Sequence, residues 1–193
     1  VAVLDVTSMH PFSAINLNLF GPYTKRFEDL VNGRVFIKHK DYDSLKKLLD
    51  GKLIPFIEDA MGDNPKYSMK DISNGLKTAI VSVYGLSFAR FDNLFRDPRN
   101  IDNIVAKRGA LFMVDLQLAV QAKGFTVAHI KTDSIKIPNA TPEIIDFVME
   151  FGKNYGYEFE HETTYEKISD DFQTSEFAKK HGMVDIVGNK KNI

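Results

Sequence analysis

The chain has 193 residues, of which 44% are hydrophobic and 26% are charged, a composition typical of a globular chain with one sizeable core or a core and a subdomain. It contains no cysteine, which excludes a disulfide framework and a thiolate metal site, and it has no apolar run of membrane-spanning length, so we expect no membrane partner. The net charge of −1 at pH 7 excludes the overall basic excess of most free-standing nucleic-acid binders, so nucleic-acid contacts would depend on local clusters of Lys and Arg.

The first predicted element is a strand over residues 1–6, which must end before Pro11, because proline continues neither a strand ladder nor a helix interior. Asp5 therefore lies at a strand end. The sequence begins within this strand and without an initiator methionine. We accordingly expect it to be an excerpt of a longer polypeptide or a processed product.

A helical region follows. Residues 23–53 predict helices, with Pro22 in a first turn. Residues 62–65 predict a turn between two helical arms. Ser73 is the expected N-cap of the next helix, and Gly85 is expected to end it.

A long amphipathic helix is predicted over residues 101–123, and Gly124 is expected to end it. Two strands are then predicted, over residues 125–130 and 134–137. The tetrad Lys131–Ser134 joins them with the spacing of a tight hairpin.

The last predicted elements are a helix and a strand. Thr141 is a suitable N-cap, and Pro142 suits the first turn of the helix that follows. Residues 159–168 predict the last strand. This order of elements predicts an α+β fold in which helices back a small antiparallel sheet.

Two aspartates lie where chemistry could occur in such a sheet. Asp5 ends the first strand and Asp133 lies at the tip of the hairpin, so both carboxylates could project into the same cleft. Carboxylates together with substrate phosphates are the ligands that Mg²⁺ prefers. In two-metal catalysis such a pair supports one ion at the attacking oxygen and one at the leaving group.

Phosphate groups also need cations. Arg34 and Lys38 are four residues apart and share one face of a helix, while Lys77, Val81 and Tyr84 line one face of the next helix. Together the three basic residues could hold a triphosphate. Each of them taken singly is also typical of a solvated surface charge.

Plainer interpretations exist for the other motifs. Taken alone, Thr132-Asp133-Ser134 is typical of an ordinary turn with local hydrogen bonds. His161 between Glu160 and Glu162 could suggest a metal cluster, but neighbours on a strand point to opposite faces, which favours a solvated strand.

Three segments in order carry a resemblance to a known family. Asp5–Pro11 resembles the first polymerase motif, which reads Asp, two variable residues, Ser, Leu or Met, Tyr and Pro. Lys77–Gly85 resembles the second, which reads Lys, three variable residues, Asn, Ser, a variable residue, Tyr and Gly. Lys131–Ser134 resembles the third, Asp-Thr-Asp-Ser. Over about residues 1–168 the chain resembles the palm and fingers of a family B DNA polymerase of the bacteriophage or viral branch.

The resemblance implies roles for individual residues. Asp5 and Asp133 would be the catalytic residues that ligate two Mg²⁺ ions, for which Mn²⁺ could substitute, and the Val6 carbonyl would be a further ligand. The implied nucleotide-binding residues are Ser8, Met9, His10, Arg34, Lys38, Lys77, Val81 and Tyr84. Gly85 and Lys167 would contact DNA.

The chain departs from the family pattern at three positions. His10 stands where the family has a tyrosine that excludes ribose, and Val81 stands where it has asparagine. Lys131 replaces the first aspartate of the third motif, which puts a cation beside the expected metal site. Neither Lys131 nor its neighbour Thr132 is assigned a role, and neither is Glu166.

The resemblance also implies a domain layout and a function. The expected parts are palm (1–20), helical fingers (21–80), palm (81–168) and a tail without a thumb (169–193). The expected function is that of a DNA-directed DNA polymerase fragment acting on primer-template DNA and deoxynucleoside triphosphates, with thumb and exonuclease domains on the parent chain. The isolated fragment could be inactive. The alternatives are another two-metal nucleotidyl transferase, such as a cyclase, and a non-catalytic DNA-binding palm remnant.

Overall fold

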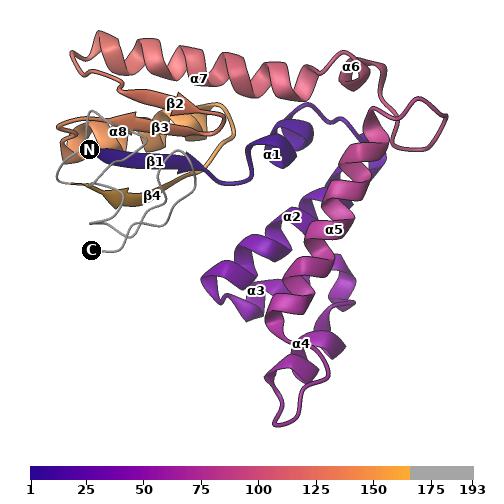
Figure 1. The fold of residues 1–193 in the computed structure, drawn as a ribbon. Helices are drawn as coiled ribbons and strands as arrows, with labels where there is room; N and C mark the ends of the chain where they lie inside the picture. Colours follow the sequence, from indigo (N-terminus) through magenta and orange to yellow (C-terminus); the bar gives the residue numbers. More distant parts are fainter. Residues whose placement is uncertain (166–193) are drawn as a thin grey trace, which may run out of the picture. The chain divides into compact units, whose positions relative to one another are not determined.

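The computed structural model describes residues 1–165. They belong to two compact units (Figure 1). Unit 1 joins Val1–Thr7 to the chain from Ala110 onward, and unit 2 comprises Ser8–Gly109. The described residues form eight α-helices and one four-stranded antiparallel sheet, which confirms the predicted α+β class. None of these helices is long and apolar enough to cross a membrane.

The sheet belongs to unit 1. Its strands are β1 (Ala2–Val6), β2 (His129–Lys131), β3 (Ser134–Ile137) and β4 (Phe159–Thr164). They lie in the order β2-β3-β1-β4, and every neighbouring pair is antiparallel. The strand that begins the chain is thus a central strand, paired with the hairpin on one side and with the last strand on the other (Figure 1).

One face of the sheet carries the core of unit 1. Leu4 pairs with Ile135 in β3, and Val6 pairs with Phe159 in β4. All four side chains are buried. Two helices cover this face, α8 (Pro142–Asn154) and the part of α7 (Ile104–Ala122) that belongs to unit 1. The Phe112 ring of α7 contacts four aromatic rings at centroid distances of 4.6–6.0 Å, those of Phe151, Tyr155, Tyr157 and Phe159.

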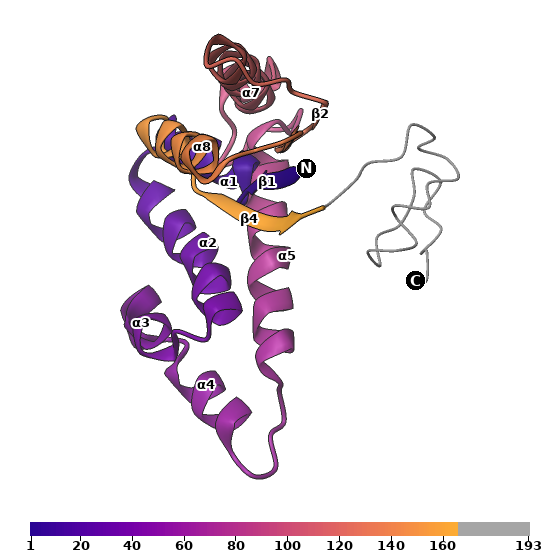
Figure 2. The same cartoon turned by 90° about the vertical axis from the view of Figure 1, so that its left-hand side faces the viewer.

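Unit 2 is helical in its described elements. These are α1 (Met9–Asn16), η1 (Gly21–Tyr23), α2 (Thr24–His39), α3 (Tyr42–Lys47), η2 (Leu48–Gly51), α4 (Ile54–Met61), α5 (Met69–Ser87), α6 (Pro98–Ile101) and the part of α7 up to Gly109. The two long helices α2 and α5 run side by side (Figures 1 and 2). Gly33 lets them approach closely, because a Cβ atom there would lie 3.0 Å from Leu76 Cδ1. The core between them contains Phe27, Val31 and Ile80.

Some predicted boundaries are wrong. Helix α5 begins at Met69 and contains Gly85, so Ser73 is not its N-cap and the glycine does not end it. Strand β2 covers only His129–Lys131, so the predicted start of this strand at residues 125–128 is wrong. By contrast, Thr141 is the N-cap of α8, as predicted.

The start of α5 is stabilised by a capping box. The Ser68 hydroxyl accepts a hydrogen bond from the Asp71 N–H at 3.2 Å, and the Asp71 carboxylate accepts one from the Ser68 N–H at 2.9 Å. The Ser68 hydroxyl also donates a hydrogen bond to this carboxylate at 2.6 Å, and together with the bond from the Ser68 N–H it holds the Asp71 pKa below its usual value. Two of the N–H groups that a helix start leaves without a partner are thereby satisfied.

We expect Ser68→Ala to lower the free energy of unfolding by about 1 kcal/mol, the usual cost of losing an N-cap. Denaturant unfolding followed by circular dichroism measures this. Ser73→Ala is the matched control, because this serine lies inside the same helix. An equal loss in both variants would contradict the capping role.

Candidate active site

The face of the sheet opposite the core carries a row of polar side chains. The strand register places Lys131 opposite Ser134, and Asp5 opposite both Ser134 and Glu160. Directly opposed residues of an antiparallel pair project from the same face. Lys131, Ser134, Asp5 and Glu160 therefore form one row across all four strands, and each is at least partly exposed.

The hairpin turn brings Asp133 to this row. The Val6 N–H donates a hydrogen bond to the Asp133 carbonyl at 2.8 Å, and the Asp133 N–H donates one to the Lys131 carbonyl at 2.7 Å. Thr132 has a φ of 52°, which is strained for a β-branched residue. The backbones of Asp5, Val6 and Asp133, predicted as metal ligands, therefore lie on directly hydrogen-bonded segments.

Glu160 is a candidate that sequence reasoning did not select. It faces Asp5 across the β1–β4 ladder, which places their Cβ atoms about 5 Å apart. Its carboxylate accepts a hydrogen bond from the Thr7 hydroxyl at 3.2 Å. Because neighbouring residues of a strand point to opposite faces, the sequence already places Glu160 and His161 on different faces of β4. Only the pairing of β4 with β1 shows that Glu160 lies on the same face as Asp5.

The donors in this region suit Mg²⁺. They are the carboxylates of Asp5, Asp133 and Glu160 and the carbonyl of Val6, all hard oxygen ligands. Over residues 1–165 no group of three or more His, Asp or Glu side chains is positioned to hold a metal ion. Mg²⁺ is usually bound by one or two carboxylates and keeps water and substrate phosphates as its other ligands.

A basic region adjoins the acidic one on the same face. His129 pairs with Lys136 across β2 and β3, and Lys131 lies two residues from His129 on the same side of its strand. Burial lowers the pKa of Lys136, Lys131 lowers it further, and Glu162 acts in the opposite sense. Burial also lowers the pKa of His129, and Lys136 and Lys131 add to this shift. The three basic groups thus interact electrostatically.

In unit 2, residues of the first and second motifs meet. The His10 ring lies edge-on to the Tyr84 ring at a centroid distance of 6.2 Å. Phe88, the residue that follows α5, has its ring centroid 5.4 Å from that of Tyr84. Burial raises the pKa of the Tyr84 hydroxyl, while a hydrogen bond with Asn100 acts in the opposite sense.

Asn100 anchors this aromatic group and was not selected from the sequence. It is 1% exposed, and its Nδ2 donates a hydrogen bond to Ser87 Oγ at 2.6 Å. The Ser87 hydroxyl donates in turn to the Tyr84 carbonyl at 2.5 Å. The asparagine lies in a stretch rich in Arg, Asp and Pro, where no sequence pattern marks a buried residue.

The predicted phosphate-binding groups of unit 2 occupy two helices. Lys77 and Val81 are exposed on α5 and line a shallow pocket of about 380 Å³. Its remaining lining residues are Asn74, Thr78 and Ser82. On α2, Lys38 is exposed, whereas Arg34 is half-buried and its Nε atom has no hydrogen-bond partner among the described residues.

The start of α1 offers backbone donors. Ser8 is its N-cap residue with a left-handed φ of 53°, and Met9 and His10 open the helix. Their N–H groups have no acceptor within the helix, and Pro11 has no N–H. Such a helix start favours anions.

Of the remaining predicted residues, Gly85 lies within α5.

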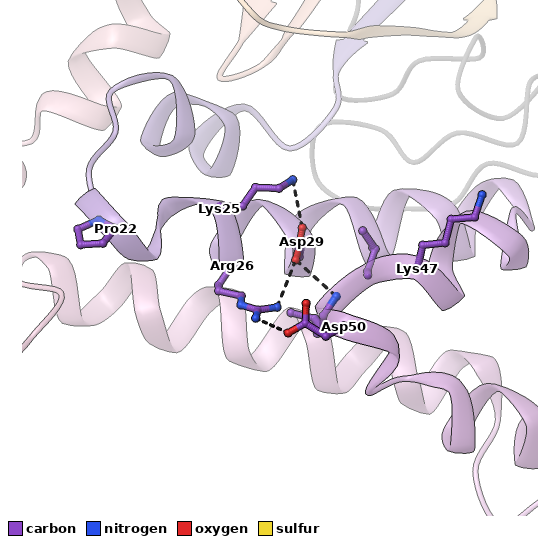
Figure 3. A pocket seen from close by; sticks show the side chains of 8 residues that line it. Pro22, Lys25, Arg26, Asp29, Lys47 and Asp50 are labelled. Atoms are coloured by element: carbon purple, nitrogen blue, oxygen red, sulfur yellow. Dashed lines mark hydrogen bonds and ion pairs between the residues drawn. The ribbon is translucent and has the colours of Figure 1, made fainter.

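A second pocket, of about 490 Å³, is lined by ion pairs (Figure 3). Asp29 is buried and lies 3.2 Å from Lys25 Nζ and 3.9 Å from an Arg26 nitrogen. It also accepts a hydrogen bond from the Leu49 N–H at 3.4 Å, and Arg26 pairs with Asp50. The carboxylates of Asp29 and Asp50 neutralise Lys25 and Arg26. We therefore interpret this pocket as a structural support for the left-handed turn at Leu49 and Asp50.

Glu166 and Lys167 lie outside the described residues, as does the expected tail 169–193.

Comparison with known proteins assigns no function to the candidate sites of units 1 and 2. No protein-family model matches the chain, and no curated protein matches it.

Proposed function

We propose that the chain is the palm and fingers part of a family B DNA polymerase, which adds deoxynucleotides to a primer 3′-hydroxyl as directed by a template. The observation that carries the proposal is the juxtaposition of Asp5, Val6 and Asp133 at the ends of β1 and the hairpin. The two aspartates come from separate motifs that are more than a hundred residues apart in the chain.

The proposed reaction is an in-line phosphoryl transfer. The primer 3′-oxygen forms a bond to the α-phosphorus while the bond from that phosphorus to its bridging oxygen breaks. The hydroxyl proton passes to solvent, and pyrophosphate leaves. Asp5 and Asp133 would hold Mg²⁺, which supplies charge neutralisation and activation of the attacking oxygen when bound.

Unit 2 would bind the triphosphate. Arg34, Lys38 and Lys77 supply positive charge, and the N–H groups of Met9 and His10 supply backbone donors. The buried Nε of Arg34 supports this role, because a guanidinium nitrogen without a partner is costly and an anion would satisfy it. The contact between His10 and Tyr84 supports a shared role beside the sugar and base.

Primer extension tests the proposal directly. We expect the protein to lengthen a labelled primer on a template only with Mg²⁺ or Mn²⁺, and to change the nucleotide added when the template base is changed. Retention of primer-template DNA without extension would instead identify a non-catalytic binding module, which the cation at Lys131 favours. Template-independent formation of a cyclic nucleotide would identify a cyclase.

A further inference from the structure

The β2–β3 hairpin displays three basic side chains on one face. His129 and Lys136 are directly opposed, and Lys131 precedes the turn that holds Asp133. Lys131 and His129 are two residues apart on one strand, so they lie about 7 Å apart along it. Lys131 therefore lies in the row that contains Asp5, and His129 and Lys136 extend the basic groups along the strands away from it.

This arrangement is unfavourable without an anion. Two lysines, Lys131 and Lys136, lie close together on one face of the hairpin, and like charges repel each other more strongly where they are partly removed from water. Here Lys136 is half-buried opposite the apolar Val3, so its charge is partly removed from water. The carboxylate that acts on it is Glu162, while the charge of Lys131 acts in the opposite sense and the His129 ring faces it from the neighbouring strand. Such a cluster gains most from an extended polyanion.

We propose that Lys131, Lys136 and His129 form a phosphate-binding strip for a DNA strand whose 3′ end lies at Asp5 and Asp133. Several basic groups spaced along a strand suit successive phosphodiesters better than a single compact phosphate. The assignment gives Lys131 a role where the resembled motif has an acid. The placement of the 3′ end at Asp5 and Asp133 rests on the proposed polymerase function, whereas the binding of backbone phosphates by the strip does not.

Salt dependence of DNA affinity tests the strip. The logarithm of the association constant falls with the logarithm of salt concentration by about 0.7 per phosphate contacted on a single strand and about 0.9 on a duplex. We expect the double variant Lys131→Gln/Lys136→Gln to reduce this slope by about 1.4–1.8. The affinity advantage of the wild type should then shrink about 7- to 12-fold between about 50 and about 200 mM salt.

The matched control removes the same charge elsewhere in unit 1. Lys123→Gln/Lys153→Gln changes an exposed lysine just after α7 and another on α8 and should leave the slope unchanged. Fluorescence anisotropy of a labelled primer-template, with thermal unfolding to verify folding, provides the measurement. Equal slopes in the strip variant and the wild type would overturn the strip. If the KM for deoxynucleotides rose while the slope stayed unchanged, the two lysines would bind the triphosphate instead of the DNA strand. Extension by the wild-type protein separately decides the polymerase proposal.

Discussion

Asp133→Asn is expected to lower the rate of primer extension by at least about 10³-fold, and Asp5→Asn should do the same. Asparagine keeps the shape of the side chain but removes the charge that would hold Mg²⁺ in the proposed site. A bound metal ion supplies several kcal/mol of transition-state stabilisation, and each 1.36 kcal/mol corresponds to a factor of ten in rate. Single-nucleotide incorporation under single-turnover conditions measures this loss without a contribution from product release.

The control for these variants is Asp146→Asn, which removes an exposed carboxylate on α8 in the same unit and should leave the rate unchanged. Retained DNA affinity and an unchanged melting temperature would show that Asp133→Asn is folded. An Asp133→Asn protein that extends primers at a rate near that of the wild type would exclude the two-metal site and the polymerase assignment with it.

Phe112→Ala is expected to reduce the free energy of unfolding by about 3–5 kcal/mol, the usual cost of truncating a buried phenylalanine. The ring is 2% exposed and contacts aromatic side chains from α8, β4 and the segment between them. Its removal leaves a cavity between the helices and the sheet that carries Asp5. The loss is a large share of the 5–15 kcal/mol that is typical of native proteins.

Urea unfolding provides the measurement for Phe112→Ala. Phe91→Ala is a suitable control, because that ring is 63% exposed and surface truncations usually change stability by no more than about 0.5 kcal/mol. A loss below about 1 kcal/mol in Phe112→Ala would show that the aromatic cluster can close around the missing ring.

Local patterns account for the elements that were predicted well. The strand that contains Asp5, the hairpin around Asp133 and the helix that begins after Thr141 each depend on a few adjacent residues. A proline in the first turn or a tight turn between two short strands acts within its own segment. Such signals can be interpreted without knowledge of the rest of the chain.

The wrong boundaries have a different cause. Ser68 and Ser73 are both acceptable N-caps, and the reciprocal hydrogen bonds with Asp71 decide in favour of the first. Gly85 could end a helix, but α5 continues through it to Ser87. There the Ser87 carbonyl accepts a hydrogen bond from the Asp97 N–H, a contact ten residues away in the sequence.

The sequence by itself determined the α+β class, the strand-end position of Asp5 and the hairpin position of Asp133, because these follow from residue spacing and turn chemistry. The tertiary structure alone decided which side chains share a face. Register set by the long-range pairing of β1 with β4 and β3 places Glu160 and Ser134 opposite Asp5. A shift of one residue would move each of these side chains to the opposite face, and only the packing of the whole sheet excludes that shift.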